Sequence, residues 1–456
     1  MGNTGIFIDF GSTFTKMVAF DLDAEELIAG VQVPSTVDSD ITIGLDQAFS
    51  LLAEDIGIGN AEREQAVACS SAAGGLRVIC VGLVSEFTTE AARIAALGAG
   101  AKIVGVYSFE LSDREIAEIE EIRPDIVLLT GGTDGGNKKV ICHNAKALAA
   151  TGPRVKNIVI AGNKSAYDAI RDIFAGTAKN LIFAKNVMPE IGVLDIESSN
   201  RTIREIFLRH ITDAKGIAKV KSKIRDVIMP TPSAVLAAAK LMADGVSGTE
   251  GFGELILVDV GGATTDVYSV ADGLPTRTGV NQVGLPEPYA KRTVEGDLGL
   301  VYNLATLQEI SKSTSATANF GEFASSSSEI GRVPVGEKQQ QIHIWLSHLA
   351  VKTAVERHVG RIEARVFPNG EMYAQRGKDL GNVKWVVGSG GPIVFSREPR
   401  LVLAGALSQD GSPGLLKPKT AELMIDKNYI MFALGLLAQS DPIKAMNLIK
   451  KYVVKL

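Results

Sequence analysis

The chain has 456 residues, of which 46% are hydrophobic and 22% are charged, so it is expected to fold into about three structural units and not to be disordered throughout. Its 47 basic and 52 acidic residues leave a net charge of −5, which provides no basic surplus for binding a nucleic-acid backbone. The three cysteines, Cys69, Cys80 and Cys142, are too few and too scattered for a disulfide framework or a zinc ribbon.

The beginning of the chain is predicted to form short strands followed by a helix. Residues 5–10, 16–20 and 28–33 are apolar and rich in residue types that favour strands. Apolar residues then recur at helical spacing between Leu45 and Leu52, which predicts the helix.

Between residues 75 and 185, apolar strands alternate with amphipathic helices. Strands are predicted over 76–83, 102–106, 125–130, 157–161 and 181–184, and helices over 86–97, 112–122, 138–150 and around 167–174. This alternation is typical of a parallel sheet covered by helices on both faces. The segment is therefore expected to form an α/β insertion with a flavodoxin-like order of elements.

The remaining elements are mixed. Helices are predicted over 201–211, 233–243, 339–359, 420–439 and 442–452, and strands over 254–260, 265–270 and 382–387. Residues 311–328 are rich in Ser, Thr and Ala and are predicted to form a loop.

Nothing in the sequence predicts a membrane segment or an export signal. The first residues lack a basic head followed by an apolar core, and a long apolar run such as 430–438 is far shorter than the roughly 20 residues that span a bilayer. We expect a cytoplasmic protein without a membrane partner.

The first glycine turn follows the first predicted strand. Asp9 ends that strand, Gly11 permits a tight turn, Ser12 and Thr13 offer hydroxyl and N–H groups, and Lys16 supplies a cation. Such a hairpin can enclose the terminal phosphates of a nucleotide, with the carboxylate organising the metal ion that bridges them. In isolation it is also compatible with an ordinary β-hairpin.

Two more glycine turns follow predicted strands. The second, around Asp259, repeats the order of the first: an apolar strand, an acid, one residue, a glycine and small polar residues. The third, residues 388–391, breaks a buried strand into glycines, which lets a flat base lie close to the backbone. It is not a P-loop, because the sequence contains no G-x-x-x-x-G-K-S/T pattern, and it is not a dinucleotide fingerprint, because Ile393 occupies the position of the last glycine.

Together, the three turns resemble the actin-like ATPase superfamily, which includes actin, chaperones, sugar kinases and dehydratase activators. The resemblance implies two ribonuclease H-like lobes that clamp MgATP. It implies that Asp9 and Asp259 serve the metal ion or the attacking water. The implied phosphate-binding residues are Gly11, Ser12, Thr13 and Lys16 in the first turn and Gly261, Gly262 and Thr264 in the second. Gly388, Gly390 and Gly391 match the adenosine loop.

Two further features concern the connecting helices of that superfamily. The helix over 233–243 resembles the first, and the small residues Ala433 and Gly435 resemble the crossing point of the second. Chaperone and actin members carry Glu or Gln where this chain has Thr231 or the nearby Ser233. Because a hydroxyl orients water but accepts a proton poorly, a slow ATPase is expected.

The pattern over nearly the whole chain resembles the glutamate mutase accessory protein family, also called MutL or GlmL. The matching segments are FIDFGSTFTK (residues 7–16), LLTGGTDGGN (128–137), MPTP (229–232) and EGDLG (295–299). The resemblance implies an ATP-driven reactivating chaperone for an adenosylcobalamin-dependent mutase. It places the first lobe in 1–74 and 186–228, the insertion in 75–185 and the second lobe in 229–456.

The insertion resembles the cobalamin-binding domain of such mutases but lacks its Asp-x-His-x-x-Gly signature. We therefore expect it to dock onto a mutase without binding cobalamin, or only to stabilise the fold. Two polar segments also leave alternatives open. The glycine loop 131–136 is compatible with an anion site or a structural turn, and Glu295 and Asp297 with second-shell metal residues or a polar loop.

Three other functions share this scaffold. A small-molecule kinase would need a carboxylate base that the sequence does not identify. An iron–sulfur dehydratase activator would need cysteines close to the connecting helices, where the sequence places none. A filament former of the actin type is the third.

Overall fold

The computed structural model describes residues 3–37, 39–71, 76–213, 217–313, 334, 336–367, 370–408 and 414–456. The chain divides into two compact units. The first contains residues 1–71, 215–282 and 289–456, and the second contains residues 72–214 and 283–288. Most of the predicted loop 311–328 lies outside the described residues, apart from 311–313, which end a helix.

The first sheet of the first unit is mixed and five-stranded. Its strands, in spatial order, are β10 (Asp226–Pro230), β4 (Val67–Ser70), β1 (Thr4–Phe10), β2 (Phe14–Asp21) and β3 (Glu26–Pro34). The first three strands of the chain form an antiparallel meander, and β4 and β10 add in parallel on the other side of β1. Strand β1 is the central strand of this sheet, and its side chains are buried from Ile6 to Phe10.

The second sheet repeats this arrangement. Its strands, in spatial order, are β16 (Ala290–Glu295), β14 (Thr265–Val270), β13 (Leu255–Val260), β19 (Trp385–Ser389), β20 (Glu422–Asp426) and β21 (Val453–Lys455). Again an antiparallel meander is followed by two strands parallel to its first member. This repeated order, 3-2-1-4-5 in each sheet, confirms the predicted pair of actin-like, ribonuclease H-like lobes.

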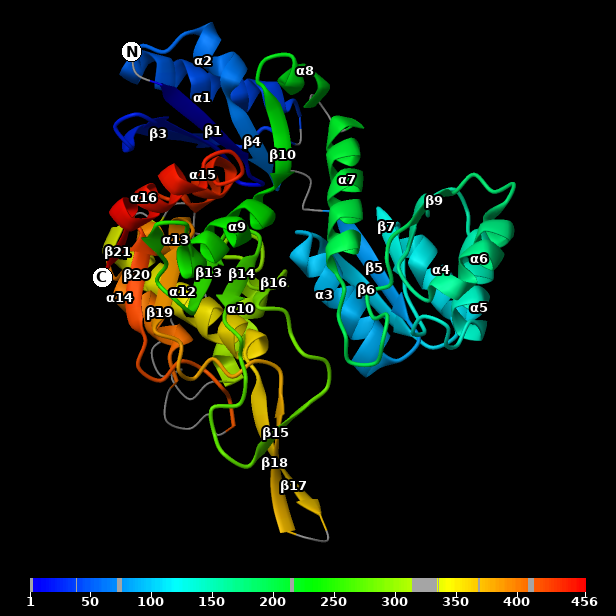
Figure 1. Ribbon diagram of the computed structural model, residues 1–456. Coiled ribbons are helices and arrows are strands. Elements are labelled where there is room, and N and C mark those ends of the chain that lie inside the picture. Colours follow the sequence, from blue (N-terminus) through cyan, green and yellow to red (C-terminus); the bar gives the residue numbers. More distant parts are fainter. Residues whose placement is uncertain are drawn as a thin grey trace. The chain divides into compact units, whose positions relative to one another are not determined.

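Helices α9 (Thr231–Asp244), α15 (Met431–Leu437) and α16 (Pro442–Tyr452) lie between the two sheets (Figure 1). Helix α9 follows β10 in the first sheet, and α15 follows β20 in the second, so the two helices are topological equivalents. They cross at Gly435, where a Cβ atom would lie 1.8 Å from the Ala234 carbonyl oxygen. The close crossing that the small residues predicted is therefore present.

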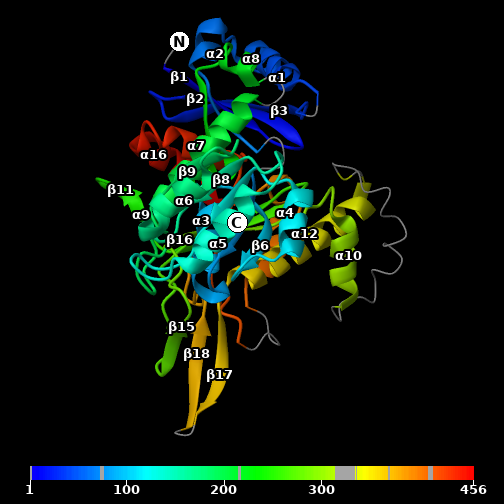
Figure 2. The ribbon, with the colours of Figure 1, turned by 90° about the vertical axis from the view of Figure 1, so that its right-hand side faces the viewer.

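Four helices belong to the other face of the second sheet. They are α10 (Leu304–Ser313), α12 (Gly336–His358), α13 (Gly391–Val394) and α14 (Pro399–Leu403), with the short 3-10 turn Ala404–Ala406. Helices α10 and α12 lie side by side (Figure 2). Strands β17 (Arg361–Phe367) and β18 (Gly370–Arg376) form a long hairpin that pairs with β15 (Val280–Val283), and β11 (Gly245–Val246) pairs with β12 (Thr249–Glu250).

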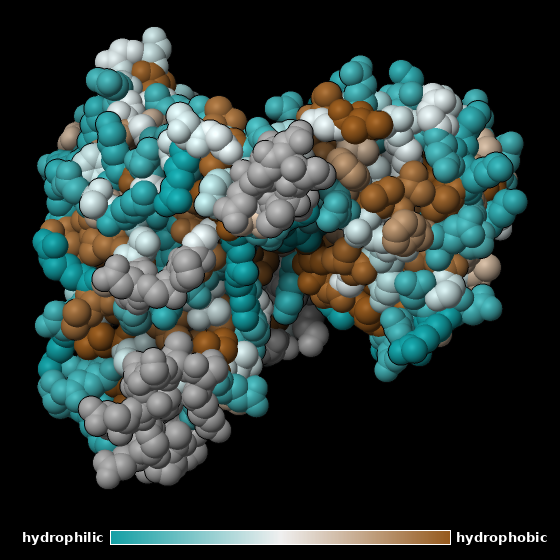
Figure 3. All heavy atoms as spheres, turned by 90° about the horizontal axis from the view of Figure 1, so that it is seen from below, coloured by the Kyte–Doolittle hydropathy of each residue, from teal (hydrophilic) through white to brown (hydrophobic). Residues whose placement is uncertain are grey.

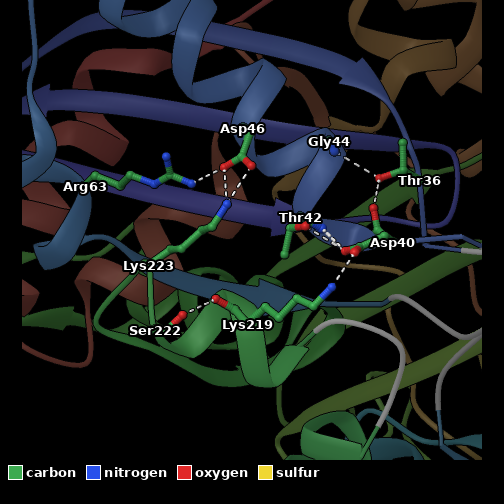
Figure 4. A network of polar contacts seen from close by, with 9 residues as sticks. All are labelled: Thr36, Asp40, Thr42, Gly44, Asp46, Arg63, Lys219, Ser222 and Lys223. Atoms are coloured by element: carbon green, nitrogen blue, oxygen red, sulfur yellow. Dashed lines mark hydrogen bonds and ion pairs between the residues drawn. The ribbon is translucent and has the colours of Figure 1, made fainter.

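A polar network fixes the place where the chain re-enters the first lobe (Figure 4). Helices α1 (Ile41–Ile56) and α2 (Asn60–Gln65) cover the first sheet, and α8 (Ile217–Lys221) precedes β10. The Asp46 carboxylate accepts from Lys223 Nζ at 2.6 Å and also pairs with Arg63. Lys219 Nζ donates to Asp40 at 3.0 Å, so two ion pairs join the returning segment to α1.

The second unit is a parallel α/β sandwich, as predicted. Its strands, in spatial order, are β6 (Lys102–Ser108), β5 (Arg77–Gly82), β7 (Ile126–Leu129), β8 (Asn157–Ile160) and β9 (Asn180–Phe183). The order 2-1-3-4-5 is that of flavodoxin-like folds. Its helices are α3 (Glu90–Gly98), α4 (Asp113–Ile122), α5 (Lys139–Ala149), α6 (Tyr167–Phe174) and α7 (Glu197–Asp213), with short turns at Ser85–Thr89 and Lys164–Ala166.

Helices in the described ranges do not combine the length and hydropathy that crossing a membrane requires. The face shown in Figure 3 mixes hydrophilic side chains with separate hydrophobic patches. Such a mixture is ordinary for a folded protein, because polar groups are too few to cover its surface.

Candidate functional site

The first glycine turn places an acid and a cation side by side. Asp9 and Lys16 are partners in the β1–β2 register, and Lys16 Nζ donates to Asp9 Oδ2 at 2.8 Å. The Gly11 N–H donates to the Phe14 carbonyl at 3.0 Å and closes the turn. A Cβ atom on Gly11 would lie 2.7 Å from that carbonyl oxygen, which explains the glycine.

The second glycine turn has the same backbone geometry with a different charge. The Gly261 N–H donates to the Thr264 carbonyl at 2.8 Å, and Asp259 faces Asp266 in the β13–β14 register. Asp266 thus occupies the position that Lys16 has in the first turn. Its carboxylate accepts from Arg292 Nε at 2.8 Å and from the Thr264 hydroxyl at 3.0 Å, so it is already neutralised.

The three turns meet within the first unit. A Cβ atom on Gly262 would lie 2.8 Å from the Thr13 hydroxyl oxygen, which brings the first two turns into contact. Gly390 has φ 89°, and a Cβ atom there would lie 2.6 Å from Asp259 Oδ1 and 2.2 Å from the Val260 carbonyl oxygen. The third turn therefore needs its glycine to approach the second.

The other two glycines of the third turn differ from each other. A Cβ atom on Gly388 would lie 2.7 Å from a methyl carbon of Ile393, so this glycine serves the packing of β19 against α13. A Cβ atom on Gly391 would make only an ordinary contact, 3.7 Å from the Phe395 ring. Of the three, Gly391 is the one with space next to it.

Thr231 lies at the start of α9 and belongs to the same cluster. Its hydroxyl donates to Asp9 Oδ1 at 2.6 Å, and the Cys69 sulfur lies 3.8 Å from that oxygen. Because its proton is donated to Asp9, the Thr231 oxygen keeps its lone pairs for accepting from water. Thr231 can therefore orient a water molecule, but it gains no capacity to take the proton.

Cys69 corrects one expectation from the sequence. It lies beside the start of α9, with its sulfur 3.5 Å from the Thr231 hydroxyl, although it is remote from that helix in the chain. Cys80 and Cys142 are in the second unit. Across the described residues, no three His, Cys, Asp or Glu side chains are grouped to hold a metal ion.

The charges of the site are coupled. Burial alone would lower the pKa of Lys16, but interactions with the Asp9 carboxylate and with Tyr429 together outweigh burial and raise the pKa above its ordinary value. Burial raises the pKa of the half-buried Asp259 carboxyl to about 7. The Lys16 ammonium opposes this rise, and nearby carboxylates, of which Asp266 has the largest effect, strengthen it.

Replacing Asp259 with asparagine is expected to stabilise the protein above neutral pH. The raised pKa means that the folded state binds more protons than the unfolded state between about pH 4 and pH 7, so wild-type stability falls as pH rises through this window. The variant lacks this loss. Its free energy of unfolding, relative to that of the wild type, should therefore be higher at pH 8 than at pH 5 by on the order of 1–2 kcal/mol. Urea denaturation of both proteins at both pH values measures this change. The prediction is contradicted if the stability difference between variant and wild type is the same at pH 5 and pH 8.

The site has features that fit a nucleotide and its metal ion. The Thr13 hydroxyl oxygen is shielded from solvent and has no hydrogen-bond partner among the described residues. An unpaired hydroxyl at the contact of two glycine turns is suited to a phosphate oxygen or a metal-bound water. Mg²⁺ commonly uses one or two carboxylates together with substrate phosphates, which the pair Asp9 and Asp259 would allow.

Two residues of this cluster were missed in the sequence. Asp426 ends β20 and is fully buried; its carboxylate accepts from the Ile430 N–H at 2.9 Å, the Met431 N–H at 3.0 Å and the Ser389 hydroxyl at 3.0 Å. An acid shortly before an apolar helix is a recognisable capping signal. Tyr429 covers Lys16, and no sequence signal indicates this contact.

The alternative sites are occupied by structural interactions. Arg357 donates to Glu295 at 2.6 Å and to Asp297 at 2.8 Å, so these acids form an ion-paired loop. The Asn163 side chain fills the glycine loop 131–136, accepting from the Gly135 N–H at 3.1 Å and donating to the Gly136 carbonyl at 3.0 Å. This favours a structural turn over an anion site.

Two comparisons of the sequence, with a family model and with a curated protein, give matches over nearly the full chain. The family model described as MutL protein matches residues 5–453. A curated relative, Protein MutL of Clostridium tetanomorphum, is 44% identical over 462 residues, which cover 99% of each chain.

Solved structures match with low identity. The activator of 2-hydroxyisocaproyl-CoA dehydratase from Clostridium difficile with bound ADPNP is 11% identical, with a TM-score of 0.32 and 98% and 96% of the two chains covered. Gluconate kinase from Lactobacillus acidophilus is 10% identical, with a TM-score of 0.36 and 100% and 93% covered. Because both TM-scores are low, the fold assignment depends on the strand order and register above.

Proposed function

Because the chain belongs to the MutL protein family, we propose that it is an accessory protein that binds MgATP between its two lobes and hydrolyses it slowly. Its partner in this proposal is an adenosylcobalamin-dependent mutase of the glutamate mutase type. The observation that carries the nucleotide site is the contact of the second glycine turn with both other turns, next to the unpaired Thr13 hydroxyl on one side and Gly390 on the other.

Each part of the cluster has a role in this proposal. Asp9 organises Mg²⁺, which would neutralise charge on the β- and γ-phosphates, and Asp259 assists the metal ion or the attacking water. The first turn binds phosphate from one side, through its backbone N–H groups and the side chains of Ser12, Thr13 and Lys16. Gly261, Gly262 and Thr264 bind it from the other. Gly388, Gly390 and Gly391 form the adenosine side of the site.

Slow hydrolysis follows from the residue at the start of α9. Thr231 donates its proton to Asp9, and the Asp9 carboxylate also holds Lys16, so neither is a ready proton acceptor. The protein would then remain in its ATP state long enough to act on a partner. ATP favours a closed state of the two lobes and ADP an open one, and the difference in affinity limits the work done on the partner.

The second unit is proposed to dock onto the mutase without binding cobalamin. His143 lies in α5, where its Nε2 atom is 3.3 Å from the Leu111 carbonyl oxygen, so it is not presented as a metal ligand. The glycine loop of this unit is closed by Asn163. Titration of the full chain with free cobalamin should give no heat, whereas the cobalamin-binding subunit of the mutase should bind.

The test of the proposal uses the full chain. Isothermal titration should show one MgATP site, and pull-down from native lysate should recover mutase subunits in amounts that differ between ATP and ADP. Absence of nucleotide binding at saturating MgATP would refute the site. Nucleotide-independent recovery of the mutase would refute the coupling but leave the site intact.

A small-molecule kinase is the second candidate, and one observation favours it. Asp259 has a pKa of about 7 and lies next to the third turn, which is a suitable acid–base character for activating an acceptor hydroxyl. Phosphate transfer to a panel of sugars and carboxylates would support this function. If no compound of the panel is phosphorylated and phosphate is released slowly from ATP, the protein is an ATPase and not a kinase.

A further inference from the structure

Tyr429 has a strained backbone in the turn between β20 and α15. Its φ is 56°, in the left-handed region that bulky side chains rarely adopt. In the described part of the chain, only three other residues besides glycines share a positive φ: Glu25, Phe109 and Arg123. Strain of this kind persists where surrounding structure enforces it, and such positions are frequent at functional sites.

The turn that holds Tyr429 is fixed at both ends. The buried Asp426 carboxylate accepts from the Ile430 and Met431 N–H groups, which anchors the start of α15. On the other side, β20 pairs with β19 up to Gly388 and Ile425. The backbone between these anchors has little freedom, so the Tyr429 ring is directed toward one place.

That place is the ammonium group of Lys16. Lys16 Nζ lies 3.9 Å from the centre of the Tyr429 ring and 2.8 Å from Asp9 Oδ2. A cation over an aromatic face is attracted by the ring, more strongly where water is excluded. Lys16 belongs to the first lobe and Tyr429 to the second, so the ammonium is held by an acid from one lobe and a ring from the other.

We propose that Tyr429 is a positioning residue, which holds the Lys16 ammonium for the terminal phosphate and connects it to helix α15. This inference rests on the proposed nucleotide function and adds a residue to it. An ammonium group has three N–H donors. Asp9 takes one, and Tyr429 interacts with the ammonium through its ring and its phenol group, which leaves a donor for a phosphate oxygen. The contact should matter more for ATP than for ADP, because ADP lacks the phosphate that Lys16 would reach.

The variant Tyr429→Asn separates this role from a structural one. Asparagine tolerates the left-handed backbone but has no ring. Loss of ring packing and relief of strain act in opposite directions, so the melting temperature should stay close to that of the wild type. The ratio of ATP to ADP affinity, measured by titration with Mg²⁺, should fall about three- to tenfold. Tyr429→Phe keeps the ring and removes only the phenol group's interaction with Lys16, so the ratio should fall less than in Tyr429→Asn.

Two further variants complete the test. Phe109→Asn is the matched control, because it replaces a left-handed aromatic residue of the second unit and should leave the ratio unchanged. In a Lys16→Met background, Tyr429→Asn should have no further effect on the ratio. An unchanged ratio in Tyr429→Asn, or an equal fall with and without Lys16, would overturn the inference. Either of these results would leave the proposed nucleotide function intact. That function would be refuted by a different result, the absence of MgATP binding by the wild type.

Discussion

Asp9→Ala is expected to weaken MgATP binding at least tenfold, which corresponds to about 1.4 kcal/mol or more. The Asp9 side chain is buried, accepts hydrogen bonds from Lys16 and Thr231, and in our proposal organises the metal ion. Its removal also leaves the Lys16 ammonium without its partner, which costs about 3–5 kcal/mol where both groups are buried. The loss of affinity therefore has to be separated from a loss of folding.

Magnesium provides that separation. Binding of ATP is measured by titration with Mg²⁺ and again with excess EDTA, for the wild type, Asp9→Ala and Asp9→Asn. If Asp9 acts through the metal ion, both variants lose affinity with Mg²⁺ and approach the wild type in EDTA. An equal loss under both conditions would mean that Asp9 acts only through Lys16, and wild-type affinity with Mg²⁺ would exclude the metal role.

Asp46→Asn is the matched control for this experiment. Asp46 is also an ion-paired carboxylate of the first unit, but its partners are Arg63 and Lys223, which do not belong to the glycine turns (Figure 4). This variant should lose some stability and keep its MgATP affinity.

Local spacing made the glycine turns readable in the sequence. In both turns an acid ends an apolar strand and a glycine follows two positions later, and each turn closes with the same backbone hydrogen bond. Two long helices were also predicted: 233–243, a run of small residues, corresponds to α9, and 339–359 corresponds to α12. These signals depend only on neighbours in the chain.

Pairing with distant strands was harder to predict. The expected helix 420–439 is wrong in its first part, where Glu422–Asp426 forms β20 between β19 and β21. A run of five residues carries no reliable periodicity, and only pairing with β19 and β21 makes it a strand. The short parallel strands β4 and β10 escaped prediction for the same reason.

In the candidate site, too, contacts between residues that are distant in the chain could not be predicted from the sequence. Lys16 and Asp9 were identified together because they flank one turn, whereas Tyr429 is hundreds of residues away and reaches Lys16 only through the fold. Its left-handed backbone leaves no trace in composition. Cys69 was misplaced because distance along the chain was taken as distance in space, yet β4 carries it to the start of α9.

Gly435→Ala is expected to lower the free energy of unfolding of the first unit by about 3 kcal/mol, at the upper end of the usual cost of overpacking. The new Cβ atom would lie 1.8 Å from the Ala234 carbonyl oxygen, and both helices are buried at this crossing. The helix backbones must therefore separate. Better helix propensity offsets only about 1 kcal/mol of this cost. Urea denaturation followed by tryptophan fluorescence reports this unit directly, since both tryptophans, Trp345 and Trp385, belong to it.

Gly30→Ala on β3 is the control for adding a methyl group to the same unit. Its Cβ atom would have its nearest neighbour at 4.0 Å, the Met17 carbonyl oxygen, so stability should change by less than about 1 kcal/mol. Because α9 begins at Thr231, whose hydroxyl donates to Asp9, and α15 follows the turn that holds Tyr429, separating the helices should also reduce the difference between ATP and ADP affinity. A Gly435→Ala protein with the wild-type denaturation midpoint would show that the two backbones are not in contact and would contradict the close crossing of α9 and α15.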